Sequence, residues 1–455
     1  MRKTSFALAL LTAAVLTACG GTDPRPGDQT TKIKFSQQVT FGDSLSDVGT
    51  YAVGGIAAMG GGQYTINGDA TSVNPELTGK NYTTLLAAQL GLPAPCAAQT
   101  GLLGTASTNP ALNFSVPVTF QANCFNYAQG GARVTNPVGP GNRALSAANA
   151  TTAIGLTTVP VVTQIDNHLA KAGGKFSGTE LVIVTAGGND VLEQINELKA
   201  NATTAGGTAL ITSLVTQLTP GTTNPATAQT AIATAARTAA AQGGDATAII
   251  TAAVTAAARA GNTAALANAT TIGTTAGAAA TAAAQKYAAD HSAELVTALG
   301  TAGAELAALV KSQILAKGAN YVIVNNLPDV SIAPAVLVES ADTQKLVATM
   351  VSTFNTQLKT GLGEDAKLLY VDLATVSHDQ AINPAPYGLT NTKTPACDLS
   401  TAKNPLGSSL VCNKNNLVSG DVSHYMFADG VHPTPFEYAL IARYILLQMS
   451  GKGWI

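Results

Sequence analysis

Two groups of residues near opposite ends of the chain could together perform nucleophilic catalysis. A serine follows a short apolar run in Phe41-Gly42-Asp43-Ser44, at a point where a strand would pass directly into a helix. A hydroxyl at such a turn lies above the sheet edge, and backbone N–H groups of the helix start face any developing anion. Near the C-terminus, Asp429 and His432 are spaced so that the carboxylate can bind Nδ1 while Nε2 accepts a proton from a serine. Taken alone, the segment with Ser44 would also fit a helix cap, and the pair Asp429 and His432 would also fit a structural turn with a surface histidine.

Two further segments offer hydrogen-bond donors for an oxyanion. The segment from Asn126 to Ala132 contains adjacent glycines, whose backbone could approach a substrate closely. Asn189 belongs to the block that follows the apolar run 181–184, so it lies at the carboxyl end of a strand, where open α/β sheets bind ligands. Its side-chain amide is a neutral donor suited to a tetrahedral oxyanion.

In this order along the chain, the four blocks resemble the GDSL, or SGNH, hydrolase superfamily, which is named for its Ser, Gly, Asn and His residues. The resemblance covers about residues 35–195 and 305–450. The string GDSLSDVGTY is most similar to the bacterial lipase and lecithinase-like branch. The resemblance implies that Ser44 is the nucleophile and that His432 is the general base, oriented by Asp429.

The same resemblance implies an oxyanion hole formed by the backbone N–H groups of Ser44 and Gly131 together with the Asn189 side chain. Aligning the second block from Asn126 favours Gly131 over Gly130 as the backbone donor.

No G-x-S-x-G string occurs in the sequence, so the nucleophile elbow of the ordinary α/β-hydrolase fold is missing. The resemblance instead implies a three-layer α/β/α sandwich with a mostly parallel, flavodoxin-like sheet.

Four short apolar runs can provide the strands that position these blocks. They occupy residues 38–41, 181–184, 321–324 and 368–371, and helix-like stretches separate them. Strands that alternate with helices predict an α/β fold with a mostly parallel sheet. We therefore expect a hydrolase domain at 35–199 and 305–455.

Residues 200–304 differ in composition from the rest of the chain. Between Lys199 and Lys286 the charged residues are Arg237, Asp245 and Arg259, in a background of Ala and Thr. Because Ala favours helix, we expect a helical insertion, which is either a cap near the active site or a mobile low-complexity excursion. Thr, Gly and Asn interrupt every apolar window, which disfavours a membrane-spanning helix.

The N-terminus has the features of an export signal. A positively charged start precedes the apolar stretch from Phe6 to Val15, which is too short to span a bilayer. We expect a signal peptide at 1–18 and a lipidated Cys19, because the preceding residues resemble a bacterial lipobox. Residues 19–34 would form a tether, and Gly20 favours the outer membrane, with the protein facing the periplasm or the cell surface. The alternative is an ordinary signal peptide with an incidental cysteine.

If Cys19 carries lipid, four cysteines remain: Cys96, Cys124, Cys397 and Cys412. An even number in an exported protein predicts disulfides. Sequence proximity favours Cys96–Cys124 and Cys397–Cys412, although four cysteines allow three pairings. No C-x-x-C string or Cys/His cluster occurs, so we expect no metal site.

Composition narrows the classes of partner. Charged residues make up 11% of the 455 residues, the formal net charge is −2, and no cluster of Lys or Arg follows the N-terminus. A nucleic-acid-binding protein needs a basic surface, so nucleic acid is not expected as a partner.

These features predict a serine ester hydrolase that works through an acyl-enzyme without a cofactor. The branch-level resemblance and the expected lipid anchor favour lipids, such as acyl glycerides or phospholipids, as substrates. Two alternatives remain open: an acetylesterase on glycans or an acyltransferase with the same site, and a non-catalytic surface-binding lipoprotein. The sequence leaves the oligomeric state open.

Overall fold

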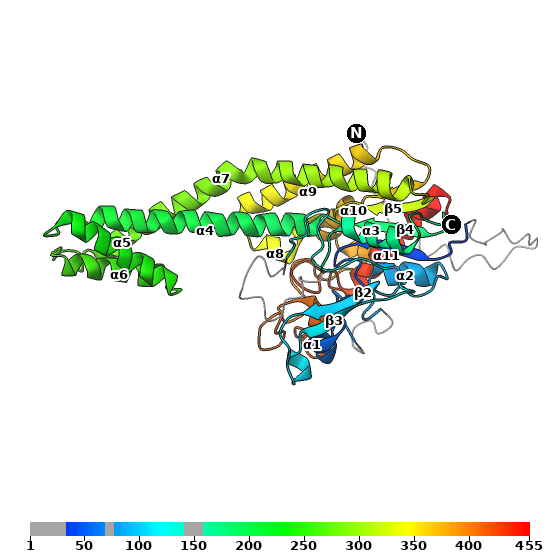
Figure 1. The fold of residues 1–455 in the computed structure, drawn as a ribbon, viewed down its shortest axis with the longest axis horizontal. Coiled ribbons are helices and arrows are strands. Elements are labelled where there is room, and N and C mark those ends of the chain that lie inside the picture. The colour runs from blue at the N-terminus through cyan, green and yellow to red at the C-terminus, as the bar shows by residue number, and fades with distance from the viewer. Residues whose placement is uncertain (1–32, 69–76, 141–157) are drawn as a thin grey trace, which may run out of the picture. The chain divides into compact units, whose positions relative to one another are not determined.

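The computed structural model describes residues 33–68, 77–140 and 158–455 (Figure 1). These residues form two compact units, of which the second is Gln194–Leu295 and the first contains the remainder of the described chain. The second unit lies in the Ala/Thr-rich part of the sequence, for which the bounds 200–304 were expected. The expected signal peptide and Cys19 lie outside the described residues.

A four-stranded parallel sheet forms the centre of the first unit. Its strands contain the four apolar runs and are β1 (Gln38–Gly42), β4 (Leu181–Thr185), β5 (Tyr321–Asn325) and β6 (Leu368–Val371). They lie in the order β1-β4-β5-β6, and every neighbouring pair is parallel. All four carboxyl ends therefore meet at one edge of the sheet, which is where parallel sheets bind ligands.

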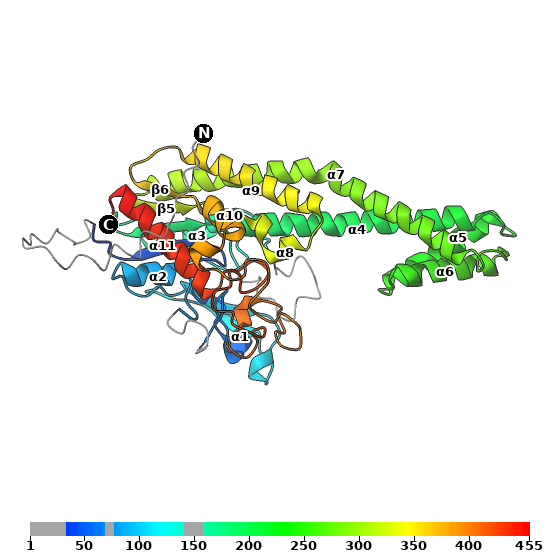
Figure 2. The ribbon, with the colours of Figure 1, turned by 180° about the vertical axis from the view of Figure 1, so that it is seen from behind.

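Helices cover both faces of this sheet (Figures 1 and 2). The helices that lie wholly in the first unit are α1 (Gly54–Ala58), α2 (Tyr82–Gln89), α3 (Val161–Lys171), α8 (Pro334–Leu337), α9 (Ala341–Leu362), α10 (Leu373–Ile382) and α11 (Pro435–Lys452). On one face, Leu181 and Ile183 of β4 pack with α2 and α11. On the other face, the ring of Phe41 meets that of His168 in α3 edge to face, with centroids 5.7 Å apart. The predicted α/β/α sandwich is confirmed.

A β-hairpin lies outside the main sheet. Its strands β2 (Gln99–Leu103) and β3 (Ser115–Phe120) are antiparallel, and the 3₁₀ turn Pro110–Leu112 lies between them. The Cys96–Cys124 disulfide closes the base of this hairpin, and a second disulfide joins Cys397 to Cys412. These are the pairs that sequence proximity favours.

The second unit is helical. Its helices are α5 (Pro225–Ala241), α6 (Ala246–Arg259) and parts of α4 (Gly188–Leu218) and α7 (Ala269–Leu309), whose other parts belong to the first unit. Asp245 caps α6 by accepting a hydrogen bond from the Ala248 N–H at 2.8 Å. Ile249 and Val254 of α6 are buried in the same cluster as Leu214 of α4, so the few large apolar side chains of this Ala-rich segment form its core.

One described helix is long and apolar enough to cross a membrane by length and composition alone. It is Ala269–Leu315, which consists of α7 and the π-helical turn Val310–Leu315. From Val296 onward this helix belongs to the first unit, where Leu299 and Leu306 are buried in protein. Because a core helix passes the same test, the segment is weak evidence for a membrane span.

Candidate active site

Ser44, His432 and Asp429 form a hydrogen-bonded chain in the first unit. Ser44 Oγ lies 2.8 Å from His432 Nε2, and His432 Nδ1 lies 2.9 and 2.8 Å from the two carboxylate oxygens of Asp429. Ser44 follows β1 and the other two residues precede α11, so the fold joins segments that are 388 residues apart. With Nδ1–H donated to Asp429, Nε2 can accept the Ser44 proton, which is the arrangement of a nucleophile and its general base.

The Asp429 carboxylate is buried and receives hydrogen bonds on both oxygens. Oδ1 accepts the backbone N–H groups of Val431 at 3.0 Å and His432 at 2.8 Å, and Oδ2 accepts the N–H of Ser409 at 2.7 Å. Burial alone would raise the pKa of Asp429, but the adjacent His432 and these hydrogen bonds hold it well below its usual range. The carboxylate is therefore ionised at neutral pH and can orient the imidazole.

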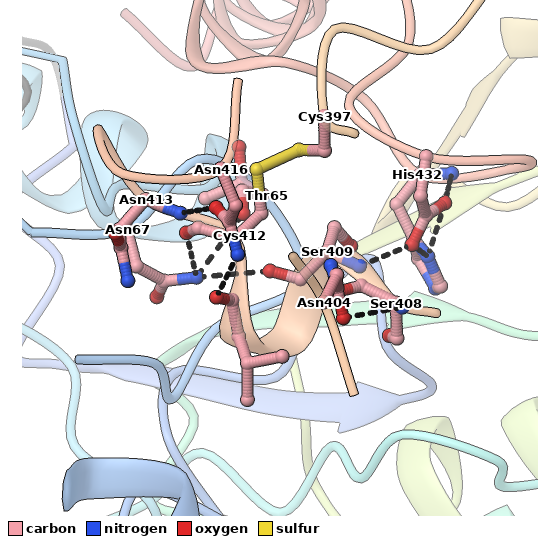
Figure 3. The surroundings of a disulfide bond; sticks show 12 residues. Thr65, Asn67, Cys397, Asn404, Ser408, Ser409, Cys412, Asn413, Asn416 and His432 are labelled. Carbon is pink, nitrogen blue, oxygen red and sulfur yellow. Dashed lines mark hydrogen bonds and ion pairs between the residues drawn. A yellow bond between two sulfur atoms is a disulfide. The ribbon is translucent and has the colours of Figure 1, made fainter. Parts of the chain in front are cut away.

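A disulfide, side-chain amides and backbone hydrogen bonds hold the segment that supplies the Ser409 N–H (Figure 3). Cys412, three residues further along this segment, forms the disulfide with Cys397. The side-chain amide of Asn67 donates to the Ser409 carbonyl at 3.0 Å and to the Cys412 carbonyl at 3.2 Å. The disulfide and this amide thereby fix the donor that Asp429 requires.

The second of the four blocks, from Asn126 to Ala132, begins along the outer edge of β1. The Thr40 N–H donates to the Phe125 carbonyl at 3.0 Å, and the Tyr127 N–H donates to the Thr40 carbonyl at 2.8 Å. Beyond this irregular pairing, the buried Asp47 carboxylate accepts the Gly130 N–H at 3.0 Å and two N–H groups of its own turn. These bonds bring the second block next to the turn that carries the nucleophile.

Of the two adjacent glycines, Gly131 presents the available backbone donor. The N–H of Gly130 is bound by Asp47, whereas no hydrogen bond among the described residues uses that of Gly131. Gly131 has a φ of +84°, which favours glycine, and it lines the same cavity as Ser44. At Gly130 a Cβ atom would collide with the Tyr64 ring and hydroxyl, so a larger residue there would displace Tyr64. The N–H of Gly131 is therefore free of the described hydrogen bonds, at a residue that lines the cavity.

Asn189 lies in the first turn of α4 and lines the same cavity. Its Nδ2 donates to the Ala132 carbonyl at 2.9 Å, which fixes the amide next to the second block. Because this nitrogen carries two hydrogens, the second N–H can serve an oxyanion. The following residue, Asp190, accepts hydrogen bonds from Arg133 Nε at 3.0 Å and the Val134 N–H at 3.1 Å, which holds the second block against α4.

A cavity of about 490 Å³ lies beside these groups, and residues of the first unit line it. Its wall is mainly apolar and includes Leu45, Leu327, Val330, Leu406, Met426 and Phe427. A cavity of this size, with a few polar groups on an apolar wall, is typical of a site for a small molecule with a large apolar part. In the part of the chain that the structure describes, no group of three His, Cys, Asp or Glu side chains is arranged to hold a metal ion.

Comparison with known proteins finds similarity over part of the chain. Residues 266–445 match the model of the GDSL-like lipase/acylhydrolase family. Two proteins of Arabidopsis thaliana are similar over shorter stretches: an anther-specific proline-rich protein is 32% identical over 100 residues, and a GDSL esterase/lipase is 34% identical over 97 residues. Each alignment covers 20% of this chain, and the chain spans about a fifth of these relatives, 18% of the first and 23% of the second.

The GDSL-like match contains only part of the candidate site. It includes Asp429 and His432, and it begins after Ser44, Gly131 and Asn189. It starts at residue 266, within the Ala/Thr-rich stretch, whereas the resemblance drawn from sequence motifs resumes at about 305. The 2.8 Å hydrogen bond between His432 and Ser44 joins the matched residues to the N-terminal block.

The structure adds groups to the site that the sequence analysis did not identify. Asp329 lines the cavity and its Oδ2 lies 2.7 Å from His378 Nδ1. The ring of Tyr64 packs against that of His432, with centroids 4.8 Å apart. Glu437, in the first turn of α11, also lines the cavity and is 2% exposed. The one sequence signal among them is that Glu437 stands three residues after a threonine, which is the spacing of a helix capping box.

The carboxyl of Glu437 is in an unusual electrostatic environment. Burial raises the pKa of Glu437 to about 8, and a hydrogen bond with the Gln380 side chain opposes that rise only in part. Its Oε2 has no hydrogen-bond partner among the described residues. Because an ionised carboxylate at this position would be poorly compensated, Glu437 is neutral at pH 7.

We expect Glu437→Gln to reduce the loss of stability at alkaline pH. The folded protein keeps the Glu437 proton up to about pH 8, whereas the unfolded chain releases it near its ordinary pKa of 4.5, so the free energy of unfolding falls as pH rises between these values. The neutral amide removes this effect. Between pH 5 and pH 8, the free energy of unfolding of the variant should rise relative to that of the wild type by about 1 kcal/mol or more.

Denaturant unfolding of both proteins at the two pH values measures this gain. Asp43, whose pKa burial raises to about 7, contributes a slope of the same sign that both proteins share. A stability difference that is the same at both pH values would contradict a neutral carboxyl at Glu437.

Proposed function

We propose that the chain is a serine ester hydrolase that cleaves carboxylic esters through an acyl-enzyme. The observation that carries this proposal is the hydrogen-bonded chain from Ser44 through His432 to Asp429, beside a cavity that Asn189 also lines. The GDSL-like match over residues 266–445 supports the same chemistry.

In the proposed reaction, His432 Nε2 removes the Ser44 proton as Oγ attacks the ester carbonyl. The backbone N–H groups of Ser44 and Gly131 and the Asn189 amide are the donors for the resulting oxyanion. His432 then passes the proton to the leaving alcohol oxygen, and the acyl group remains on Ser44. Water, deprotonated by His432, attacks this acyl-enzyme, and its collapse releases the acid and returns a proton to Ser44. Asp429 stabilises the imidazolium in both steps.

The proposed substrates are esters with an extended acyl chain, as in glycerides or phospholipids. The apolar side chains of Leu45, Leu327 and Phe427 line the cavity beside the nucleophile. Burial of each methylene group contributes about 0.8 kcal/mol, so a mainly apolar cavity of about 490 Å³ favours acyl chains longer than acetyl. An acetylesterase or an acyltransferase would use the same triad, and the dependence of rate on chain length and acceptor distinguishes them.

We further propose that the mature protein begins at a lipidated Cys19 and is tethered to the outer membrane. The support is the lipobox-like string that ends at Cys19 and the Gly- and Pro-containing linker that follows it. Such a tether would hold the hydrolase close to lipid substrates.

Initial rates on p-nitrophenyl esters from acetate to palmitate test the ester hydrolase proposal. We expect kcat/KM to be highest for chains longer than acetate, and Ser44→Ala to lower the rate about 1,000-fold or more, because it removes the nucleophile. Ser340→Ala, at the N-cap of α9, is the matched control and should retain wild-type activity. Unaltered turnover in Ser44→Ala would exclude the serine mechanism, and a maximum at acetate would favour the acetylesterase alternative.

Asn189→Ala tests the oxyanion donor. Because the oxyanion forms only during the reaction, loss of one donor should lower kcat about 100- to 1,000-fold with little change in KM. Thermal unfolding should accompany the kinetics, since the variant also loses the hydrogen bond to Ala132. A folded variant whose kcat is within about threefold of the wild type would remove Asn189 from the proposed mechanism.

Cys19→Ser tests the lipid anchor. In a bacterial host that processes lipoproteins, the wild type should incorporate labelled fatty acid and sediment with membranes, whereas the variant should do neither. Membrane association and labelling that persist in Cys19→Ser would show that this cysteine is not the anchor.

A further inference from the structure

The β2–β3 hairpin, which lies outside the main sheet (Figure 1), carries large apolar side chains that are exposed to solvent. Leu103 is 49% exposed, Leu112 58% and Phe120 71%. No charged residue or histidine occurs in the sequence between Lys80 and Arg133, which includes the whole hairpin. The hairpin thus combines several exposed apolar side chains with an uncharged sequence, a composition suited to contact with another apolar phase.

Apolar packing connects the hairpin with the substrate cavity. Leu102 of β2 is buried in a cluster against which Val116 of β3 packs, and the same cluster includes Leu406, Leu410 and Tyr64. The last three residues also line the cavity of the candidate site. The buried side of the hairpin therefore packs on residues that also form the wall along which an acyl chain would lie.

The backbone of the hairpin is poorly suited to pairing with a strand of another protein. Pro117 in β3 has no N–H to donate to a ladder. The pairing of β2 with β3 is itself irregular between Thr100 and Leu102. The hairpin thus offers side chains rather than backbone groups, and the Cys96–Cys124 disulfide holds its base in place.

We propose that this hairpin docks the protein on a lipid–water surface, with Leu103, Leu112 and Phe120 inserted among the acyl chains. The inference rests on the proposed ester hydrolase function, because it describes how an ester in a lipid aggregate reaches the cavity. The hairpin itself carries no charge, and the Nζ of Lys171 at its base donates to the Gln121 and Cys124 carbonyls at 2.9 and 2.8 Å, so binding depends on apolar burial and not on attraction to anionic headgroups. Binding is therefore similar on zwitterionic and anionic vesicles and insensitive to salt.

Sedimentation with phosphatidylcholine vesicles, with and without phosphatidylglycerol, tests the docking surface. The full chain carries Cys19→Ser in every case, so that no lipid anchor contributes. The additional double substitution Leu112→Ser/Phe120→Ser should weaken vesicle partitioning about tenfold or more on both vesicles and at low and high salt. The matched control, Ile382→Ser/Leu447→Ser, removes two exposed apolar side chains from α10 and α11 and should bind like the parent protein.

Hydrolysis assays separate this inference from the ester hydrolase proposal. The Leu112→Ser/Phe120→Ser protein should have the same kcat/KM as the parent on dissolved p-nitrophenyl butyrate. Its rate of hydrolysis of an ester embedded in vesicles should be about tenfold lower than that of the parent. Ser44→Ala should bind vesicles like the parent protein. Equal vesicle binding by parent and double variant, or binding that requires anionic lipid or low salt, would overturn the docking surface. Binding lost in the double variant, with no hydrolysis of either ester by the parent, would support the docking surface and overturn only the proposed activity.

Discussion

The buried carboxylate of Asp429 is the constraint on which the geometry of the candidate site depends. A charge removed from water is tolerated only where hydrogen bonds and an opposite or polar partner replace its hydration. Here three backbone N–H groups and the His432 imidazole replace it, and they come from two separate segments of the chain. Satisfying Asp429 therefore fixes the loop before α11 and the segment around Ser409 together. It also determines which imidazole nitrogen faces Ser44.

Buried carboxylates organise the other loops of the site in the same way. Asp47 joins the turn after the nucleophile to Gly130, and Asp190 joins α4 to the second block through Arg133. Burial raises the pKa of both aspartates, so the hydrogen bonds that they accept offset a real cost of desolvation. These carboxylates follow β1 and β4, where the backbone leaves the ladder and its N–H groups need new partners. Irregular loops are thereby held in a defined geometry beside a rigid sheet.

The sequence was most informative where the structure depends on local patterns. Apolar runs predict the four parallel strands, and the family resemblance carried by the four blocks predicts that Ser44 and His432 meet. By contrast, the Asn67 amide supports a carbonyl 342 residues away, and Asp329 and Glu437 reach the cavity from separate loops and helices. Such contacts leave no periodicity and no composition signal, because each depends on one side chain meeting a distant backbone group. They can be found only once the chain is folded.

The same burial that makes Glu437 neutral strengthens the interactions that the proposed reaction requires. An apolar wall excludes water, and electrostatic interactions are stronger where water is excluded. When His432 takes the Ser44 proton, the imidazolium interacts with the ionised Asp429 in these surroundings. A second ionised carboxyl next to His432 would compete for that positive charge, and burial raises the pKa of the nearby Asp43 to about 7, which opposes its ionisation. Burial opposes the ionisation of both Asp43 and Glu437 on the cavity wall, whereas His432 and the hydrogen bonds of two loops hold Asp429 in its ionised form.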